Sequence, residues 1–160
     1  MKERFTYFSP IGPLCIEAED GKISSLQFSD RELTSENFDP KLLTSVTEQL
    51  NDYFAGYRFE FDLPIQPSGT DFQKKVWNEL LNIPYGQLAT YGKVAQMLGD
   101  KNLVRAVGGA NSKNPIAIII PCHRVVGAKN NLIGYAGGLW RKKWLLQHEI
   151  TNKPDEANLW

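Results

Sequence analysis

The segment "PIQPSGT", residues 64–70, separates two parts of the chain that have different hydrophobic patterns. It is rich in proline, glycine and serine, a composition that interrupts regular structure. Before it, apolar residues come in short runs typical of strands; after it, they recur at helical spacing. We therefore predict an α/β N-terminal subdomain over residues 1–66, with a small antiparallel sheet plus a helix. A mainly helical C-terminal subdomain over 67–150 and a polar, frayed tail over 151–160 should follow.

The N-terminal part contains three short β-type runs, "RFTYFSP", "GPLCIEAED" and "GKISSLQFS". The "EDGK" between the last two is a hairpin signal, because Asp-Gly suits a two-residue turn. The run "DPKLLTSVTEQLNDYFAGY" predicts a helix with Asp39 as N-cap, Pro40 at its first position and Gly56 just past its end. The alternation in "RFEFDLPI", residues 58–65, predicts one more strand.

Four helices are expected beyond residue 70. The first starts near Thr70 or Asp71, the second runs from a Thr90 cap to Gly99, the third covers about 102–110, and the last lies in "GGLWRKKWLLQHEI". The second and third are joined by "GDK" and resemble a helix-turn-helix. Any two consecutive short helices produce this pattern, so it indicates DNA binding only in combination with the basic residues that begin in the second of these helices.

Basic residues are concentrated in residues 101–148, although the whole chain has no net charge. This stretch contains no Asp or Glu and has a formal charge of +8, which the remainder balances with −8. Its basic residues are Lys101, Arg105, Lys113, Arg124, Lys129, Arg141, Lys142 and Lys143. Such a block is typical of a protein that binds a polyanion, although a solvated basic face explains it equally well.

No part of the sequence suggests a membrane or secretory protein. The start "MKERFTYFSP" lacks an apolar signal region, and no apolar run approaches the roughly 18 residues of a membrane span. We expect no membrane partner and a cytoplasmic location, or a nuclear one in a eukaryote.

The segment "IIIPCHRVVG", residues 118–127, places Cys122 beside His123 in a chain with two cysteines and two histidines. A thiol attacks as its thiolate, so a neighbouring imidazole that takes its proton would activate it. Glu149 is a candidate to orient that imidazole. An inert buried thiol at the end of a strand remains the alternative, and a cysteine hydrolase of the Cys–His type is another. Two cysteines and two histidines are too few for a typical zinc site together with a catalytic cysteine, and we predict no metal.

Longer motifs change the balance between these alternatives. The signature "IPCHRVVG" resembles the active-site sequence of the O6-alkylguanine-DNA alkyltransferases. The stretches "IPYGQLATYGKVAQMLG", "RAVGGANSKNPIAIIIPCHRVVG" and "GYAGGLWRKKWLLQHE" resemble the same family, in its order and at its separations. The resemblance covers residues 68–150; residues 1–65 match the family only in general layout.

The resemblance implies roles for individual residues. Cys122 would be the alkyl acceptor, His123 and Glu149 would deprotonate it through a water, and Asn114 would brace the turn before the active-site strand. Tyr91 would donate to the departing purine, and Arg105 would fill the gap left by an extruded base. Further DNA contacts would come from Thr90, Lys101, Gly108 and Gly109, the two glycines breaking the recognition helix. The base pocket would include Tyr135, Val125 and Ala136, and Arg124 would serve the structure more than the chemistry.

The implied function is repair of DNA that carries alkylated bases. The protein would flip out O6-alkylguanine, and also O4-alkylthymine, and transfer the alkyl group irreversibly to Cys122, without a cofactor. It would act once, as a monomer in the minor groove of double-stranded DNA, with no obligate protein partner. The N-terminal half lacks the Cys and His set of zinc-binding relatives and the cysteine cluster that repairs phosphate lesions. A non-catalytic damage sensor with the same fold is the main rival, and alkylation of Cys122 separates the two.

Overall fold

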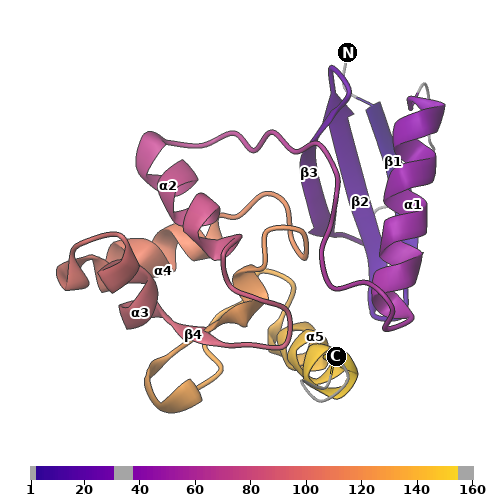
Figure 1. The fold of residues 1–160 in the computed structure, drawn as a ribbon. Helices are drawn as coiled ribbons and strands as arrows, with labels where there is room; N and C mark the ends of the chain where they lie inside the picture. Colours follow the sequence, from indigo (N-terminus) through magenta and orange to yellow (C-terminus); the bar gives the residue numbers. More distant parts are fainter. Residues whose placement is uncertain (1–2, 31–37, 155–160) are drawn as a thin grey trace.

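The structure is a computed structural model that describes residues 3–30 and 38–154. Its N-terminal part is a three-stranded antiparallel sheet in the order β1 (Glu3–Ser9), β2 (Gly12–Glu19) and β3 (Lys22–Phe28), with helix α1 (Pro40–Phe54) alongside it (Figure 1). Its C-terminal part is mainly helical, as predicted from the sequence.

Local sequence signals determine the N-terminal elements. Asp20 and Gly21 both have positive φ, as the tight turn between β2 and β3 requires, and this confirms the predicted hairpin. The Asp39 side chain accepts a hydrogen bond from the Lys41 amide and caps α1, whereas Gly56, at φ +88°, follows its end. Alternate β2 residues are buried, as are α1 residues three or four apart, so the two apolar faces form one core.

The strand predicted over residues 58–65 is wrong. Only Ile65 forms a bridge, in parallel with Ile23 of β3. The backbone of Asp62 is instead satisfied by the Gln49 side chain of α1, which accepts from its amide and donates to its carbonyl at 2.9 Å each. The alternating apolar side chains Phe61, Leu63 and Ile65 do pack against the core, but from a loop and not from a strand.

The C-terminal part contains α2 (Asp71–Leu80), β4 (Ala89–Thr90), α3 (Tyr91–Met97), the 3₁₀ turn η1 (Lys101–Leu103) and α4 (Val104–Ser112). After a long turn come the 3₁₀ helix η2 (Cys122–Arg124), β5 (Val125–Val126), η3 (Ala128–Asn130) and α5 (Leu139–Asn152). Strands β4 and β5 pair in parallel. Thr70 and Thr90 cap α2 and α3 as predicted, and α5 includes the first two residues of the expected tail. Residues 155–160 lie outside the described part.

Two predictions about local structure in this half are wrong. Gly108 and Gly109 do not break a helix, because α4 continues through both to Ser112, held by the buried Val107 and Ala110. The active-site strand expected after Asn114 does not form. In residues 116–120, Ile118 has φ +71°, and the amides of Ile119 and Ile120 bond to carbonyls within the same turn. Cys122 therefore follows a buried, tightly folded loop.

That loop joins the two halves of the molecule. The Leu26 amide of β3 donates to the Pro115 carbonyl, and the Ala117 amide donates back to the Leu26 carbonyl, both at 2.8 Å. A single apolar core runs from the sheet into the helical part. In Figure 1 the sheet with α1 lies on one side, α2, α3 and α4 on the other, and α5 below them. Within the described residues, no helix is long and apolar enough to cross a membrane.

The cap of α2 gives a stability prediction. Thr70 Oγ1 accepts from the Gln73 amide at 3.1 Å, and Gln73 Oε1 accepts from the Thr70 amide at 2.9 Å. Thr70→Ala should lower the free energy of unfolding by about 1 kcal/mol, because the Gln73 amide loses its acceptor at the end of the helix. Urea denaturation measures this, with the exposed Thr44→Ala of α1 as control. Equal loss in both variants would contradict the role of the cap.

Candidate active site

Cys122 lies at the start of η2, in the wall of a cavity of about 790 Å³. The thiol residue is only 6% exposed. Of the predicted pocket residues, Tyr135 and Ala136 line this cavity, as do Tyr91, Gly108 and Asn114. Val125, a fully buried residue of β5, does not line it. The cavity thus brings the cysteine together with groups from α3, α4 and the loop before α5.

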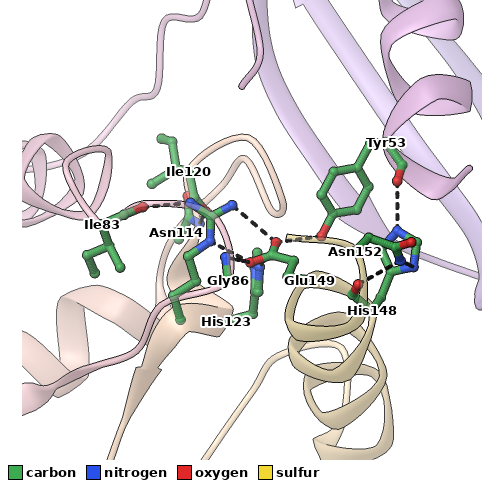
Figure 2. A network of polar contacts seen from close by, with 10 residues as sticks. Tyr53, Ile83, Gly86, Asn114, Ile120, His123, His148, Glu149 and Asn152 are labelled. Atoms are coloured by element: carbon green, nitrogen blue, oxygen red, sulfur yellow. Dashed lines mark hydrogen bonds and ion pairs between the residues drawn. The ribbon is translucent and has the colours of Figure 1, made fainter. Parts of the chain in front are cut away.

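His123 does not line the cavity, and its ring contacts Glu149 of α5 (Figure 2). Its Nε2 is 2.6 Å from Glu149 Oε2, and both side chains are almost completely buried. Because an ionised carboxylate can only accept, Nε2 carries the proton and Nδ1 keeps its lone pair. Nδ1 is buried and has no partner among the described residues. The imidazole is therefore held in the tautomer that leaves Nδ1 able to accept a proton.

Glu149 is surrounded by donors. Arg124 Nε donates to Oε1 at 2.7 Å and Nη2 to Oε2 at 3.1 Å, while the Tyr53 hydroxyl donates to Oε2 at 2.7 Å. The Gly86 amide adds a 3.3 Å contact to Oε1. Burial alone would raise the pKa of Glu149, but His123 and Arg124 hold it well below its usual range. The carboxylate stays ionised beside the imidazole.

The thiol and the imidazole are both neutral before reaction. Burial raises the pKa of the Cys122 thiol, and the hydrogen bond from Asn114 and the charge of Lys142 offset only part of this. Burial lowers the pKa of His123, which Glu149 raises only in part. A neutral thiol near a neutral imidazole is the starting state of a general-base reaction.

Asn114 braces the loop that carries Cys122. Its Nδ2 donates to the Ile120 carbonyl at 2.9 Å, and its Oδ1 accepts from the Ile116 amide at 3.0 Å. The side chain closes the turn over residues 114–120 and so fixes where η2 begins.

Comparisons with known proteins identify the family. Family models described as "6-O-methylguanine DNA methyltransferase, ribonuclease-like domain" and "6-O-methylguanine DNA methyltransferase, DNA binding domain" match residues 4–67 and 71–151. This chain belongs to the 6-O-methylguanine DNA methyltransferase family. The methylated-DNA–protein-cysteine methyltransferase of Mycobacterium tuberculosis H37Rv is 44% identical over 158 residues, which are 96% of each chain.

Solved structures of family members have the same fold. The crystal structure of the M. tuberculosis O6-methylguanine methyltransferase matches with a TM-score of 0.85 and 40% identity over 99% of each chain. That of M. tuberculosis OGT in complex with DNA matches with a TM-score of 0.85 and 44% identity over 96% of each chain.

A buried lysine of the methyltransferase site was missed in the sequence. Lys142 of α5 is fully buried, and its Nζ donates to the carbonyls of Val125, Ile133 and Gly134 at 2.6, 3.0 and 3.3 Å. It ties the pocket loop to β5 beside the thiol. Helical spacing was the available signal, because Lys142 lies three residues before Leu145 and seven before Glu149, on the buried face of α5.

Two further pocket contributions were also missed. Gln27 and Phe28 of β3 line the cavity, so the N-terminal sheet forms part of its wall. Asn111 of α4 is 5% exposed and donates to the Cys122 carbonyl at 3.4 Å. No local pattern marks these residues, because only the tertiary fold brings them to the cavity.

The remaining predicted residues lie outside the cavity. Arg105 is exposed on α4, Lys101 is exposed on η1, and Gly109 is exposed on α4 with open space around it. Thr90 lies at the N-terminus of α3, where its hydroxyl accepts from the Lys93 amide.

The basic block over residues 101–148 is not one solvated face, because Arg124 and Lys142 are buried and Arg141 donates to the Ile11 and Gly137 carbonyls. Its exposed members are Lys101, Arg105, Lys113, Lys129 and Lys143.

Proposed function

We propose that this protein repairs DNA by transferring the alkyl group of an O6-alkylguanine to the sulfur of its own Cys122. The main support for the proposal is Cys122 in a cavity wall, followed directly in the chain by His123, whose Nε2 proton is fixed by the buried Glu149 carboxylate. Family membership supports the same reaction, since the M. tuberculosis relatives are named for it and one is in complex with DNA.

The transfer begins with the proton of the thiol. It passes to Nδ1 of His123 through an intervening water, and Glu149 stabilises the imidazolium that forms. The thiolate attacks the alkyl carbon, so an S–C bond forms as the C–O6 bond breaks. The electron pair stays on the guanine, which takes up the proton and leaves as the unmodified base.

Tyr91 is suited to assist the departing base. Its hydroxyl lies at the cavity and donates to the Ile133 carbonyl at 3.2 Å, an acceptor that it can exchange for the purine ring. A donor to the ring stabilises the charge that develops there. Burial raises the pKa of Tyr91, so the hydroxyl keeps its proton.

The target base must leave the duplex to reach Cys122, because the thiol lies inside a cavity. We propose that residues 67–150 bind the minor groove of double-stranded DNA with α4 and that Arg105 occupies the vacated stack. Lys101, Thr90 and the side-chain-free surface at Gly108 and Gly109 would contact the backbone. We further propose that O4-alkylthymine is accepted, that one monomer suffices for each lesion, and that the protein acts in the compartment that holds the DNA.

Arg105 provides a test of base extrusion. Arg105→Ala should slow transfer from duplex DNA by about tenfold or more, because a flipped base then lacks a side chain in its place. Transfer from free O6-methylguanine base should be unchanged, since no base is extruded. Single-turnover rates on both substrates measure this, with the exposed Lys41→Ala of α1 as control. Equal slowing on both substrates would contradict the assignment.

Stoichiometry tests the function itself. A thioether is a poor electrophile, so the alkyl group should stay on Cys122 and each molecule should act once. Repaired duplex, counted against protein at increasing excess of DNA, should reach a plateau at about one per active molecule. Continued turnover would favour a cysteine hydrolase, and binding without repair would favour a damage sensor.

A further inference from the structure

One ligand of the Glu149 carboxylate comes from the N-terminal part of the chain. Tyr53, near the end of α1, donates its hydroxyl to Glu149 Oε2 at 2.7 Å, across 96 positions of sequence. Both side chains are completely buried, and Figure 2 shows the phenol directed at the carboxylate. The other donors to Glu149, among the described residues, belong to Gly86, His123 and Arg124.

Tyr53 and His123 share one oxygen. Oε2 receives His123 Nε2 at 2.6 Å, the Tyr53 hydroxyl at 2.7 Å and Arg124 Nη2 at 3.1 Å. A carboxylate has about four acceptor positions, so these contacts leave it little freedom to rotate. The hydroxyl also takes up part of the charge that Oε2 presents to the imidazole.

The neighbouring residue of α5 holds Tyr53 in place. His148 Nε2 donates to the Tyr53 carbonyl at 2.7 Å, and Asn152 Nδ2 contacts His148 Nδ1 at 3.3 Å. The Tyr53 ring packs against the rings of Phe61 and His148, with centroids 5.5 and 5.4 Å apart. Two consecutive residues of α5 therefore hydrogen-bond to Tyr53: His148 to its backbone carbonyl and Glu149 to its hydroxyl.

We propose that Tyr53 is a positioning residue of the alkyl transfer: its hydroxyl fixes the orientation and charge of Glu149 and thereby the basicity of His123. The inference rests on the proposed function, because it assigns a role in that reaction. It makes the N-terminal part of the chain a contributor to the catalytic apparatus as well as to the pocket wall.

The proposal predicts a change in the pH dependence of the reaction. Without the hydroxyl, Oε2 presents more negative charge to His123 and favours its protonated form. A protonated imidazole cannot take the thiol proton, so the rate should begin to fall at a higher pH. Among the described residues, the other charged or titratable groups that interact with this carboxylate or imidazole include Arg124, Lys142, Tyr85 and Tyr135, and the substitution leaves them unchanged.

Tyr53→Phe tests the proposal, since it keeps the ring and removes only the donor. We expect the single-turnover rate constant at saturating O6-methylguanine duplex to fall about tenfold, while the affinity for the duplex stays unchanged. In a plot of this rate constant against pH, the decline on the acid side should begin at a higher pH than in the wild type. Rates are compared at a temperature at which circular dichroism shows every variant folded.

Two other tyrosines provide matched controls. Tyr85 faces the same carboxylate, but its hydroxyl has no hydrogen-bond partner among the described residues, so Tyr85→Phe should keep the wild-type rate. Tyr7 donates to Asn51 Oδ1 at 2.6 Å, so Tyr7→Phe loses a similar bond away from Glu149. A Tyr53→Phe variant with the wild-type rate and pH profile would overturn the inference, and so would equal slowing in Tyr7→Phe. An inactive wild-type protein would instead overturn the proposed function, and the inference with it.

Discussion

Glu149→Gln is expected to slow alkyl transfer by about a thousandfold. The carboxylate fixes the proton on His123 Nε2 and stabilises the imidazolium, whereas an amide can donate as well as accept and carries no charge to stabilise the imidazolium. Single-turnover transfer from an O6-methylguanine duplex measures the loss, and duplex affinity should stay unchanged because Glu149 is completely buried. The exposed Glu48→Gln of α1 is the control. A rate within a few-fold of wild type would contradict the role of Glu149 as orienter.

The same substitution should lower the free energy of unfolding by about 3 kcal/mol, because the buried Arg124 loses its counter-ion. In the wild type, this contribution of Glu149 is present above the carboxyl pKa of the unfolded chain, about 4.3, and is lost as the pH falls below it. His123 adds to acid sensitivity at higher pH. Burial lowers its pKa, so its contribution is present above about pH 6.5 and declines below that. Urea denaturation between pH 7 and about pH 2 should show a progressive loss of the free energy of unfolding, and a flat profile would contradict it.

Lys142→Met is expected to lower the free energy of unfolding by about 3 kcal/mol, because three carbonyls lose their donor in a buried site. It should also make the thiol of Cys122 less acidic, since the charge of Lys142 lowers its pKa. The rate of alkylation by iodoacetamide as a function of pH measures the second effect, and its midpoint should move to higher pH.

The adjacent Lys143→Met provides the control for both effects. Lys143 is exposed, so its substitution removes the same charge from the same helix without releasing a buried carbonyl. Equal behaviour of the two variants would show that general charge, and not the buried position, is responsible.

Sequence predicted the parts of the fold that short-range chemistry decides. Asp20-Gly21, the caps Asp39, Thr70 and Thr90, and the end at Gly56 all act within a few residues, and all occur as expected. The strand at 58–65 failed because a distant side chain, Gln49, satisfied its backbone. The active-site strand expected before Cys122 is wrong because Ile118 turns the chain at positive φ, which no residue pattern indicates.

The residues of the site also fall into two groups, those recognisable from the sequence and those identified only from the structure. Cys122, His123 and Glu149 were recognisable from motifs, and the structure brings the last two into contact. Tyr53 and Lys142 were not recognised, because a tyrosine and a lysine on amphipathic helices read as ordinary side chains until their partners are known. Their importance lies in contacts between elements far apart in sequence.

Transfer of the alkyl group to Cys122 is tested by the intact mass of the protein after incubation with a duplex that contains one O6-methylguanine. We expect a gain of a single methyl group that maps to Cys122, saturates at one per protein, persists in Cys15→Ala and is absent in Cys122→Ala. Lesion binding with no change in mass, or a methyl group on another residue, would contradict it.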